Sequence, residues 1–197
     1  VKEEVVVDMP TNWGHFKLHA FTASNGQLHL ALVKGEWDEN EAVMVRVHSC
    51  CLTGDVFGSM RCDCGGQLHD AMHMVEDAGK GVVLYMNQEG RGIGLTEKLK
   101  AYLLQDEGLD TVDANLELGH QVDSRDWSEA IAILKNLDLD SITLLTNNPE
   151  KVKAVAESGI TCVQKSLVIE PNEFNKKYLS TKAERLGHHV AHQSGGK

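Results

Sequence analysis

Residues 141–165 read SITLLTNNPEKVKAVAESGITCVQK, and this stretch decides the class of fold. Apolar residues dominate 141–146, with the length and composition of a buried strand. Asn148 is a favourable helix N-cap, Pro149 suits the first helical position, and Gly159 suits the helix end. A last strand is predicted over 160–165. Strands that alternate with helices in this way indicate a partly parallel sheet in the second half of the chain.

The first half of the chain begins with strands before the alternation sets in. Strands are predicted over 16–22, 27–34, 43–48 and 81–86, and the turn Asn25-Gly26 joins the first two as a hairpin. The periodicity of apolar residues predicts helices over 66–78, 93–107, 124–137 and 172–187. We therefore expect an α+β fold: a mixed sheet with early antiparallel strands, then alternating strands and helices packed around it.

Composition limits the classes of function. The 197 residues, 42% of them hydrophobic, suit one domain over 1–197 with a real core. A net charge of -10 argues against a nucleic-acid partner, and an anionic ligand requires a few basic groups to converge against this field. Because neither a long apolar run nor a signal peptide is visible, we expect no membrane partner and a cytoplasmic protein.

The polar end of the chain, about residues 189–197, is expected to be disordered. His188, His189 and His192 are assigned to this frayed end in preference to a second metal site.

Four of the five cysteines lie within positions 50–64, and this distribution argues against the disulfide framework of a secreted protein. Cys51, Cys62 and Cys64 have the spacing C-x10-C-x-C. Three thiolates bind zinc and leave a fourth position open for water, and zinc lowers the pKa of such a water to about 7. The spacing alone also fits a structural zinc site completed by His48 or His69, or buried free thiols.

Several polar segments lie at the ends of predicted strands. Residues 88–94 (QEGRGIG) follow a buried strand and open a helix, where glycines and a helix N-terminus favour an anion. Asp123 and Arg125 lie where a loop enters a helix, and Thr146 and Lys151 flank the next strand-to-helix turn. Taken singly, each segment also fits an ordinary structural role: a glycine-rich turn, a helix cap with a solvated arginine, or a surface lysine.

Taken together, these segments resemble GTP cyclohydrolase II, the first enzyme of riboflavin synthesis. The resemblance is carried by VRVHS (45–49), CLTGD (51–55), RCDCG (61–65), QEGR (88–91) and LTNNP (145–149). It extends from about residue 10 to residue 188. In many organisms this domain follows dihydroxybutanone phosphate synthase in one chain, and an initial residue other than Met fits such a fusion.

The resemblance implies a role for each matching position. Cys51, Cys62 and Cys64 correspond to the zinc ligands. Asp123 corresponds to the proton acceptor, Arg125 to the nucleophile, and Tyr102 to a tyrosine needed to complete the second hydrolysis. The positions that contact GTP correspond to Arg46, Val47, His48, Ser49, Cys50, Gln67, Glu89, Gly90, Arg91, Thr111, Thr146 and Lys151.

The implied reaction opens the imidazole ring of GTP at C8. Its products are formate, pyrophosphate and 2,5-diamino-6-hydroxy-4-(5-phosphoribosylamino)pyrimidine. The family uses one zinc ion per subunit, with Mg²⁺ on the triphosphate, and commonly forms homodimers. An arginine nucleophile is chemically surprising because guanidinium stays protonated, so an electrostatic role for Arg125 at the α-phosphate is an equal alternative.

Two positions depart from the family pattern. Cys50 stands where glutamate is usual, and Asn87 stands where a basic residue is common. We expect an intact fold with weakened turnover or altered binding. The alternatives to full activity are an altered paralogue that stops at the formamidopyrimidine and a zinc-containing GTP-binding module with little turnover.

Overall fold

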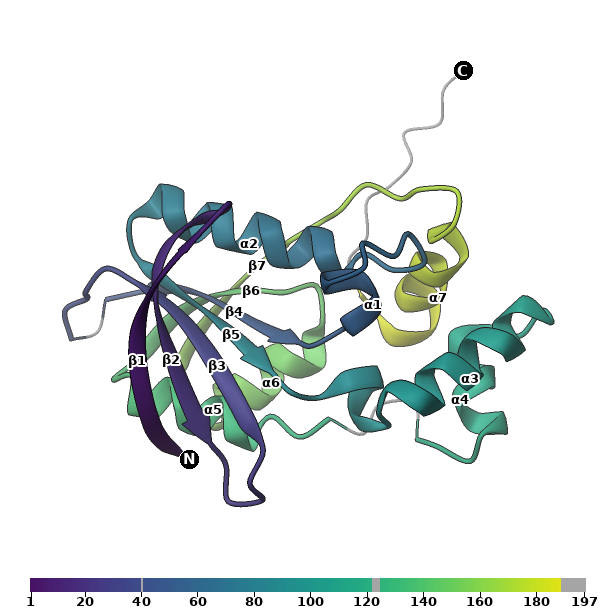
Figure 1. Cartoon of the computed structure of the whole chain (residues 1–197), viewed down its shortest axis with the longest axis horizontal. Helices are drawn as coiled ribbons and strands as arrows, with labels where there is room; N and C mark the ends of the chain where they lie inside the picture. The colour runs from purple at the N-terminus through teal and green to yellow at the C-terminus, as the bar shows by residue number, and fades with distance from the viewer. Residues whose placement is uncertain (40, 122–124, 189–197) are drawn as a thin grey trace.

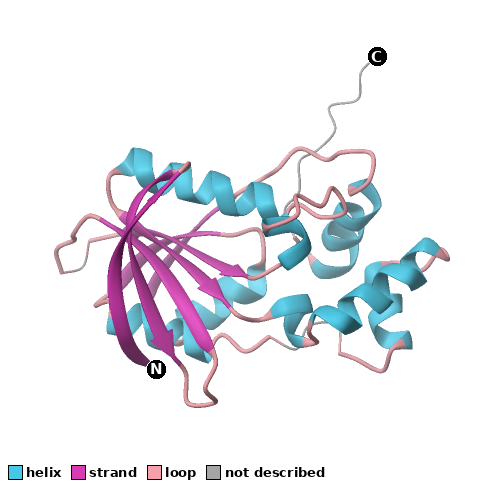
Figure 2. Ribbon diagram, in the orientation of Figure 1, coloured by secondary structure: helices cyan, strands magenta, loops and turns pink. Residues whose placement is uncertain are grey.

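The computed structural model describes residues 1–39, 41–121 and 125–188, except for the side chain of Lys177. Over these ranges the chain forms a sheet in the order β1-β2-β3-β5-β4-β6-β7. The strands are β1 (Lys2–Thr11), β2 (Gly14–Thr22), β3 (Leu28–Lys34), β4 (Val43–Ser49), β5 (Gly81–Met86), β6 (Ser141–Leu145) and β7 (Thr161–Lys165). β1, β2, β3 and β5 pair antiparallel, whereas β5, β4, β6 and β7 pair parallel. The predicted α+β fold with a mixed sheet is confirmed (Figure 2).

Helices cover both faces of the sheet and extend beyond one end of it (Figure 1). Their bounds are α1 (Leu52–Asp55), α2 (Cys64–Ala78), α3 (Leu95–Asp106), α4 (Thr111–Glu117), α5 (Ser128–Asn136), α6 (Pro149–Glu157) and α7 (Lys176–Leu186), with a 3-10 helix η1 (Glu89–Gly92). α2 covers one face, where Val75 packs with Phe16 and Val83. α5 and α6 cover the other, where Leu134 packs in a cluster with Leu84. β5 places Val82 and Leu84 against one layer and Val83 against the other, because successive side chains of a strand point to opposite faces.

Sequence patterns did not predict β1, α1, η1 or α4, and the bounds of several helices differ from those predicted. β1 escaped prediction because most of its residues are exposed, which removes the period-two signal. α4 is a short helix that begins after the N-cap Asp110. α5 begins at Ser128, later than the predicted residue 124, because the Asp126 side chain accepts hydrogen bonds from the backbone N–H and hydroxyl of Ser128 ahead of the helix.

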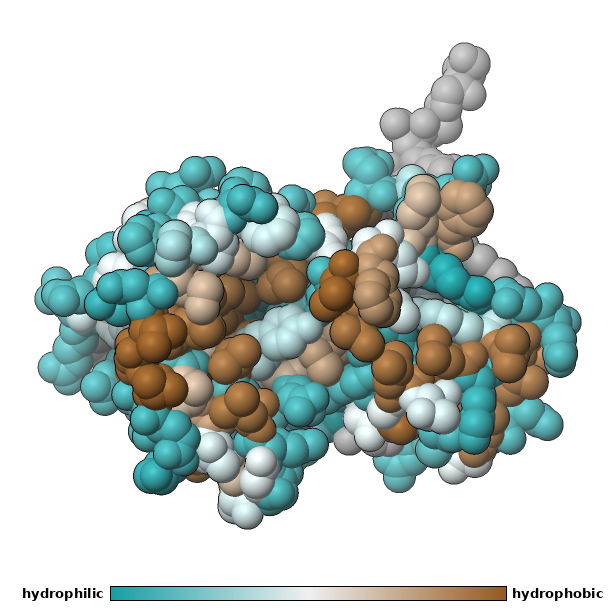
Figure 3. Space-filling view, viewed as in Figure 1, coloured by the Kyte–Doolittle hydropathy of each residue, from teal (hydrophilic) through white to brown (hydrophobic). Residues whose placement is uncertain are grey.

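Apolar side chains also reach the surface. They gather over the β1–β3 strands and along α1 and α3 (Figure 3), and include Val5, Val7, Leu28, Phe57 and Leu103. Within the described ranges, no helix is both long and apolar enough to cross a membrane.

Candidate functional site

The candidate site lies at the carboxyl ends of three parallel strands. β4 ends at Ser49, β5 at Met86 and β6 at Leu145, and the segments that follow each of them line one cavity. In open α/β sheets, ligands bind in the crevice outside these strand ends. Residues far apart in sequence therefore meet because the strands that carry them are neighbours.

The thiols of Cys51, Cys62 and Cys64 meet at this end of the sheet. Their sulfur atoms lie within 4.8 Å of one another, and the Sγ atoms of Cys51 and Cys62 are 3.7 Å apart. Tetrahedral zinc with Zn–S bonds of about 2.3 Å separates its sulfur ligands by about 3.8 Å. The donor set and its spacing therefore fit zinc.

The contacts around Cys51 favour its thiolate form. Hydrogen bonds from the thiols of Cys62 and Cys64 lower the pKa of Cys51, and Lys98, whose Nζ lies 2.9 Å from its sulfur, acts in the same direction. The hydrogen bond with Cys51 raises the pKa of Cys62 to about 11, and the pKa of Cys64 is also raised. Of the three thiols, Cys51 is therefore the one whose thiolate form is favoured, and the thiolate is the form that binds a metal.

His48 and His69, the two residues considered as a fourth ligand, are engaged elsewhere. His48 Nε2 lies 3.0 Å from Asp55 Oδ1, while Asp55 Oδ2 accepts hydrogen bonds from the Cys51 backbone N–H and the Tyr85 hydroxyl. His69 stacks on Trp13 with ring centroids 3.9 Å apart. Among the residues that the structure describes, the group of close metal-ligand atoms consists of the three cysteines. This arrangement favours an open site over a closed structural one.

A series of buried, hydrogen-bonded polar side chains adjoins the thiols. Arg46 donates from NH1 to the Leu145 carbonyl at 3.0 Å and from NH2 to Gln67 Oε1 at 2.6 Å. Gln67 donates in turn to Asp63, which lies between the two close-spaced cysteines. Burial lowers the pKa of Arg46 to about 10, so the guanidinium remains charged at neutral pH.

The η1 turn has an unusual backbone. Gly90 and Arg91 are both left-handed, with φ of 63° and 59°. Glu89 accepts hydrogen bonds from the Leu52 backbone N–H and from Lys98 Nζ, and these contacts tie the turn to the metal-binding segment. Because Gly90 and Arg91 are both left-handed, the turn fixes the directions of their backbone N–H groups as well as the path of the chain.

Two cations that line the cavity share one aromatic ring. Trp127 has the Arg125 guanidinium 4.7 Å and the Lys151 ammonium 4.6 Å from its ring centroid. Lys151 also donates to the Val47 carbonyl at 2.7 Å and is 4% exposed. Such cation–π contacts hold the charged groups in place without neutralising them.

Most residues predicted from the sequence line this cavity together. Besides the three cysteines they are Arg46, His48, Ser49, Cys50, Gln67, Glu89, Gly90, Arg91, Tyr102, Thr111, Arg125, Thr146 and Lys151. Val47 does not line it, since its side chain packs in the apolar core. Asp123 lies outside the described residues. Burial raises the pKa of Tyr102 to about 12, which keeps its hydroxyl protonated.

Sequence reasoning missed several lining residues, among them Lys98, Asn115, Tyr178, Lys182 and His188. The assignment of His188 to a frayed tail was wrong, because the left-handed Gly187 caps the end of α7 and His188, the next residue, lines the cavity. Burial and the cation Lys182 lower the pKa of His188 to about 3, so its ring is neutral. Lys98 lies in the first turn of α3, seven residues beyond the QEGR motif, and its nearness to that motif is the signal that could have found it.

The two departures from the family pattern lie in contact. Cys50 Sγ is 3.8 Å from Asn87 Oδ1, at the mouth formed by the ends of β4 and β5. Burial and the nearby Glu89 carboxylate raise the pKa of Cys50 to about 11, so this thiol is protonated and uncharged. A neutral pair therefore stands where an acid and a base are usual.

Comparison with known proteins agrees with this geometry. A sequence model of the family described as GTP cyclohydrolase II matches residues 2–166. A GTP cyclohydrolase-2 of Neisseria meningitidis is 50% identical over 181 residues, which are 91% of this chain and 92% of that protein.

Longer relatives match as well. The riboflavin biosynthesis protein RibBA of Cytophaga hutchinsonii is 55% identical over 192 residues, and that of Porphyromonas gingivalis is 54% identical. The match covers 96% of this chain and 47% of either relative, so the chain spans about half the length of these proteins. The family match and the Neisseria relative, which is covered almost completely, lead to one conclusion: the chain belongs to the GTP cyclohydrolase II family.

Proposed function

We propose that this chain hydrolyses GTP at C8 of its imidazole ring. The products are formate, pyrophosphate and 2,5-diamino-6-hydroxy-4-(5-phosphoribosylamino)pyrimidine. One observation carries the proposal: a metal-binding group of three thiols and a set of buried cations line the same cavity. The reaction needs both, since the ring must be attacked by water while the phosphates are held. The five free cysteines suit a reducing compartment, which fits a cytoplasmic enzyme.

Cys51, Cys62 and Cys64 hold the proposed zinc ion. When bound, zinc supplies a water of lowered pKa and an electrophile for the ring. Lys98 keeps Cys51 in its thiolate form, because its Nζ lies 2.9 Å from the sulfur. Tyr102 lines the same end of the cavity and offers a protonated hydroxyl to the opened ring.

Arg125 and Lys151 orient the phosphates from their places on Trp127. Arg46 and Arg91 line the same cavity and add positive charge to it, and Mg²⁺ accompanies the triphosphate. Placing these cations in a protein of net charge -10 concentrates the attraction for an anion at one location. We also propose, from the family resemblance alone, that the chain acts as a homodimer and that Asp123 accepts a proton.

The contact with Trp127 favours an electrostatic role for Arg125. A guanidinium stacked on an aromatic face remains charged, and a charged guanidinium has no free electron pair with which to attack phosphorus. Arg125→Lys keeps the charge but loses the planar fork. We expect this variant to retain much of the pyrophosphate release, and a collapse of release to the level of Arg125→Ala would support the nucleophile.

The experiment that tests the function combines metal and product measurements. The purified chain is analysed for zinc and incubated with GTP, and formate, pyrophosphate and the diaminopyrimidine are quantified. We expect about one zinc ion per chain and equal amounts of formate and pyrophosphate. Binding of GTP without any product would refute the enzymatic proposal and leave a binding module.

The neutral contact between Cys50 and Asn87 supports a second candidate, an enzyme that stops at the formamidopyrimidine. Replacing an acid beside the thiols changes the proton acceptors available for the second hydrolysis. Pyrophosphate release without formate would establish this candidate. The ratio of the two products therefore separates it from the complete reaction.

A further inference from the structure

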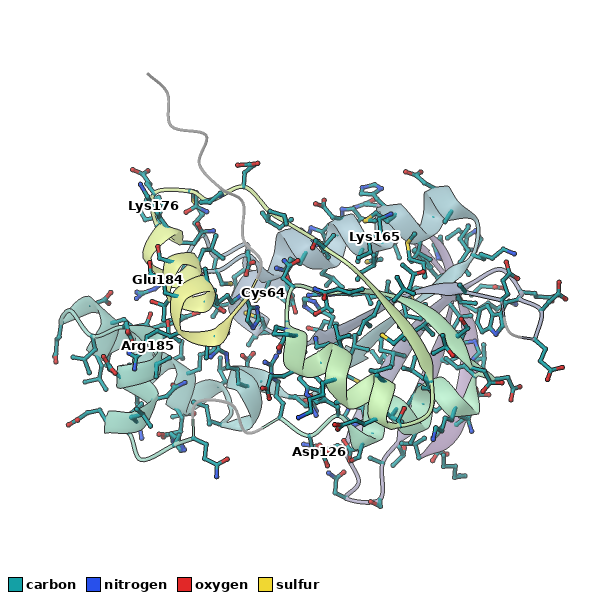
Figure 4. The ribbon with its side chains drawn as sticks, turned by 180° about the vertical axis from the view of Figure 1, so that it is seen from behind. Cys64, Asp126, Lys165, Lys176, Glu184 and Arg185 are labelled. Carbon is teal, nitrogen blue, oxygen red and sulfur yellow. The ribbon has the colours of Figure 1, made fainter. Side chains whose placement is uncertain are left out.

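Helix α7 contributes to the cavity although it lies beyond the residues that the family model matches. That match ends at residue 166, whereas α7 spans Lys176–Leu186. Tyr178 and Lys182 of this helix line the cavity. In Figure 4, α7 lies directly beside Cys64, at the N-terminal end of α2.

The principal contact from α7 is an ion pair with Asp63. Lys182 Nζ lies 2.8 Å from Asp63 Oδ1, and the two side chains are 11% and 6% exposed. The ammonium also lies 4.5 Å from the ring centroid of Tyr178. Breaking a buried ion pair from one side leaves an uncompensated charge, so each partner fixes the position of the other.

Asp63 is separated from two thiol-bearing residues by one peptide bond each, because it lies between Cys62 and Cys64. Its second oxygen, Oδ2, accepts a hydrogen bond of 2.6 Å from Gln67. Gln67 accepts from Arg46, which in turn donates to the end of β6. Lys182 is therefore the last member of this buried series of hydrogen-bonded side chains, which fixes the loop that carries two metal-binding thiols.

α7 itself is held firmly enough to serve as an anchor. Asn147 exchanges two hydrogen bonds with the backbone of Leu167, where the chain leaves β7 for α7. At the far end of the helix, Arg185 forms ion pairs with Asp110 and Asp113 of the α4 region. These contacts attach the segment that carries α7 to the turn after β6 on one side and to the α4 region on the other.

We propose that Lys182 is a positioning residue for the metal site. It holds Asp63, and through Asp63 the Cys62–Cys64 loop, in the geometry that binds the metal. The inference deepens the proposed function, on which its metal-dependent part rests. The ordering of the loop itself requires no bound metal, and this allows the two ideas to be tested separately.

The first measurement uses the metal-free protein. Native protein is alkylated with iodoacetamide, and the rate at each cysteine is followed by mass spectrometry. We expect Lys182→Met to speed modification of Cys62 and Cys64 by several-fold relative to Cys162, which lies on β7. Lys182→Arg, which retains the charge, should remain near the wild-type rates. Lys176→Met, on the exposed start of α7, is the matched control and should change nothing.

The second measurement is zinc affinity by competition with a chromophoric chelator. Residues that orient metal ligands typically change affinity by about 10- to 100-fold when they are replaced, and we expect a loss in this range for Lys182→Met. Asp63→Asn provides a second variant, should the methionine variant not fold, and is expected to produce the same faster alkylation and weaker zinc binding.

Wild-type alkylation rates and zinc affinity in folded Lys182→Met or Asp63→Asn would overturn the inference. A wild-type chain that takes up no zinc would instead contradict the proposed function. In that event the alkylation rates alone decide the role of Lys182.

Discussion

The sheet and the helices beyond its end are held together in different ways. Both apolar core clusters are built from the sheet, its covering helices and the adjoining segments, and include fully buried residues such as Leu84, Ile133 and Leu144. Within the described residues, neither cluster contains a side chain from η1, α3, α4 or α7. Those elements bury a few apolar side chains, such as Ala114 and Leu179, outside the two clusters. They are also joined by ion pairs such as Lys98–Glu89 and Lys182–Asp63.

This difference separates stability from function. Apolar burial supplies most of the free energy of folding and tolerates little change in volume. Charged contacts contribute less net stability but fix direction, which a site for a metal and an anion requires. Substitutions in the core of the sheet should therefore lower stability, whereas substitutions among the charged contacts should change metal or GTP binding.

The largest effect is expected when a thiol is removed. Cys62→Ser should reduce GTP turnover to background, because serine replaces a soft thiolate with a neutral hydroxyl and the metal loses a ligand. The urea midpoint of the metal-free variant should remain close to that of the metal-free wild type. Turnover that survives in a zinc-depleted Cys62→Ser preparation would contradict the assignment of this ligand.

Leu134→Ala tests the apolar core between the sheet and α5. Leu134 is fully buried on α5, and such truncations cost about 2–5 kcal/mol of unfolding free energy. Zinc affinity and the KM for GTP, measured well below the unfolding midpoint, should stay near wild type. A shift in either constant comparable to the loss of stability would show that the core and the site are coupled.

Trp127→Leu should weaken GTP binding by several-fold. Each cation–π contact contributes about 0.5–1 kcal/mol at an exposed site, and leucine removes the ring shared by Arg125 and Lys151. Trp127→Phe keeps an aromatic face and serves as the control. Calorimetric titration with a non-hydrolysable GTP analogue measures the effect, and equal affinity in both variants would mean that the ring does not position the cations.

The smallest effect concerns Asp110. Its carboxylate accepts hydrogen bonds from the backbone N–H groups of Val112 and Asp113 at the start of α4, so Asp110→Ala should cost about 1 kcal/mol in urea unfolding. Asp110→Asn should keep most of this cap.

The stabilisation that the Asp110 carboxylate provides should decrease as the pH falls. Burial raises the pKa of this carboxyl, but the backbone hydrogen bonds and Arg185 outweigh it, so the folded pKa is lowered. The stabilisation is present above the unfolded pKa, about 3.9, and is lost as the pH falls through the folded value. Wild type and Asp110→Asn should therefore converge in stability below about pH 4. A difference that persists undiminished in more acidic solution would exclude the carboxylate as its source.

The sequence predicted the elements whose residues alternate or run together, such as β5 and α6, and it missed β1 because that strand is exposed on both faces. The C-x10-C-x-C spacing predicted that Cys51, Cys62 and Cys64 lie together. Lys98 and Lys182 escaped because their partners, Cys51 and Asp63, lie 47 and 119 residues away. Trp127 falls within the helix predicted over 124–137, and apolar periodicity does not indicate which cations lie over a ring.

The left-handed turn at Gly90 and Arg91 has a practical consequence for variant libraries. At φ of 59° the backbone at position 91 suits glycine better than any residue with a Cβ, so the backbone gives no reason for arginine there. A glycine at 91 would fold without difficulty and would remove a cation from the cavity. Screens that select for expression or thermal stability will therefore retain this substitution, and only an assay of ligand binding or turnover will reject it.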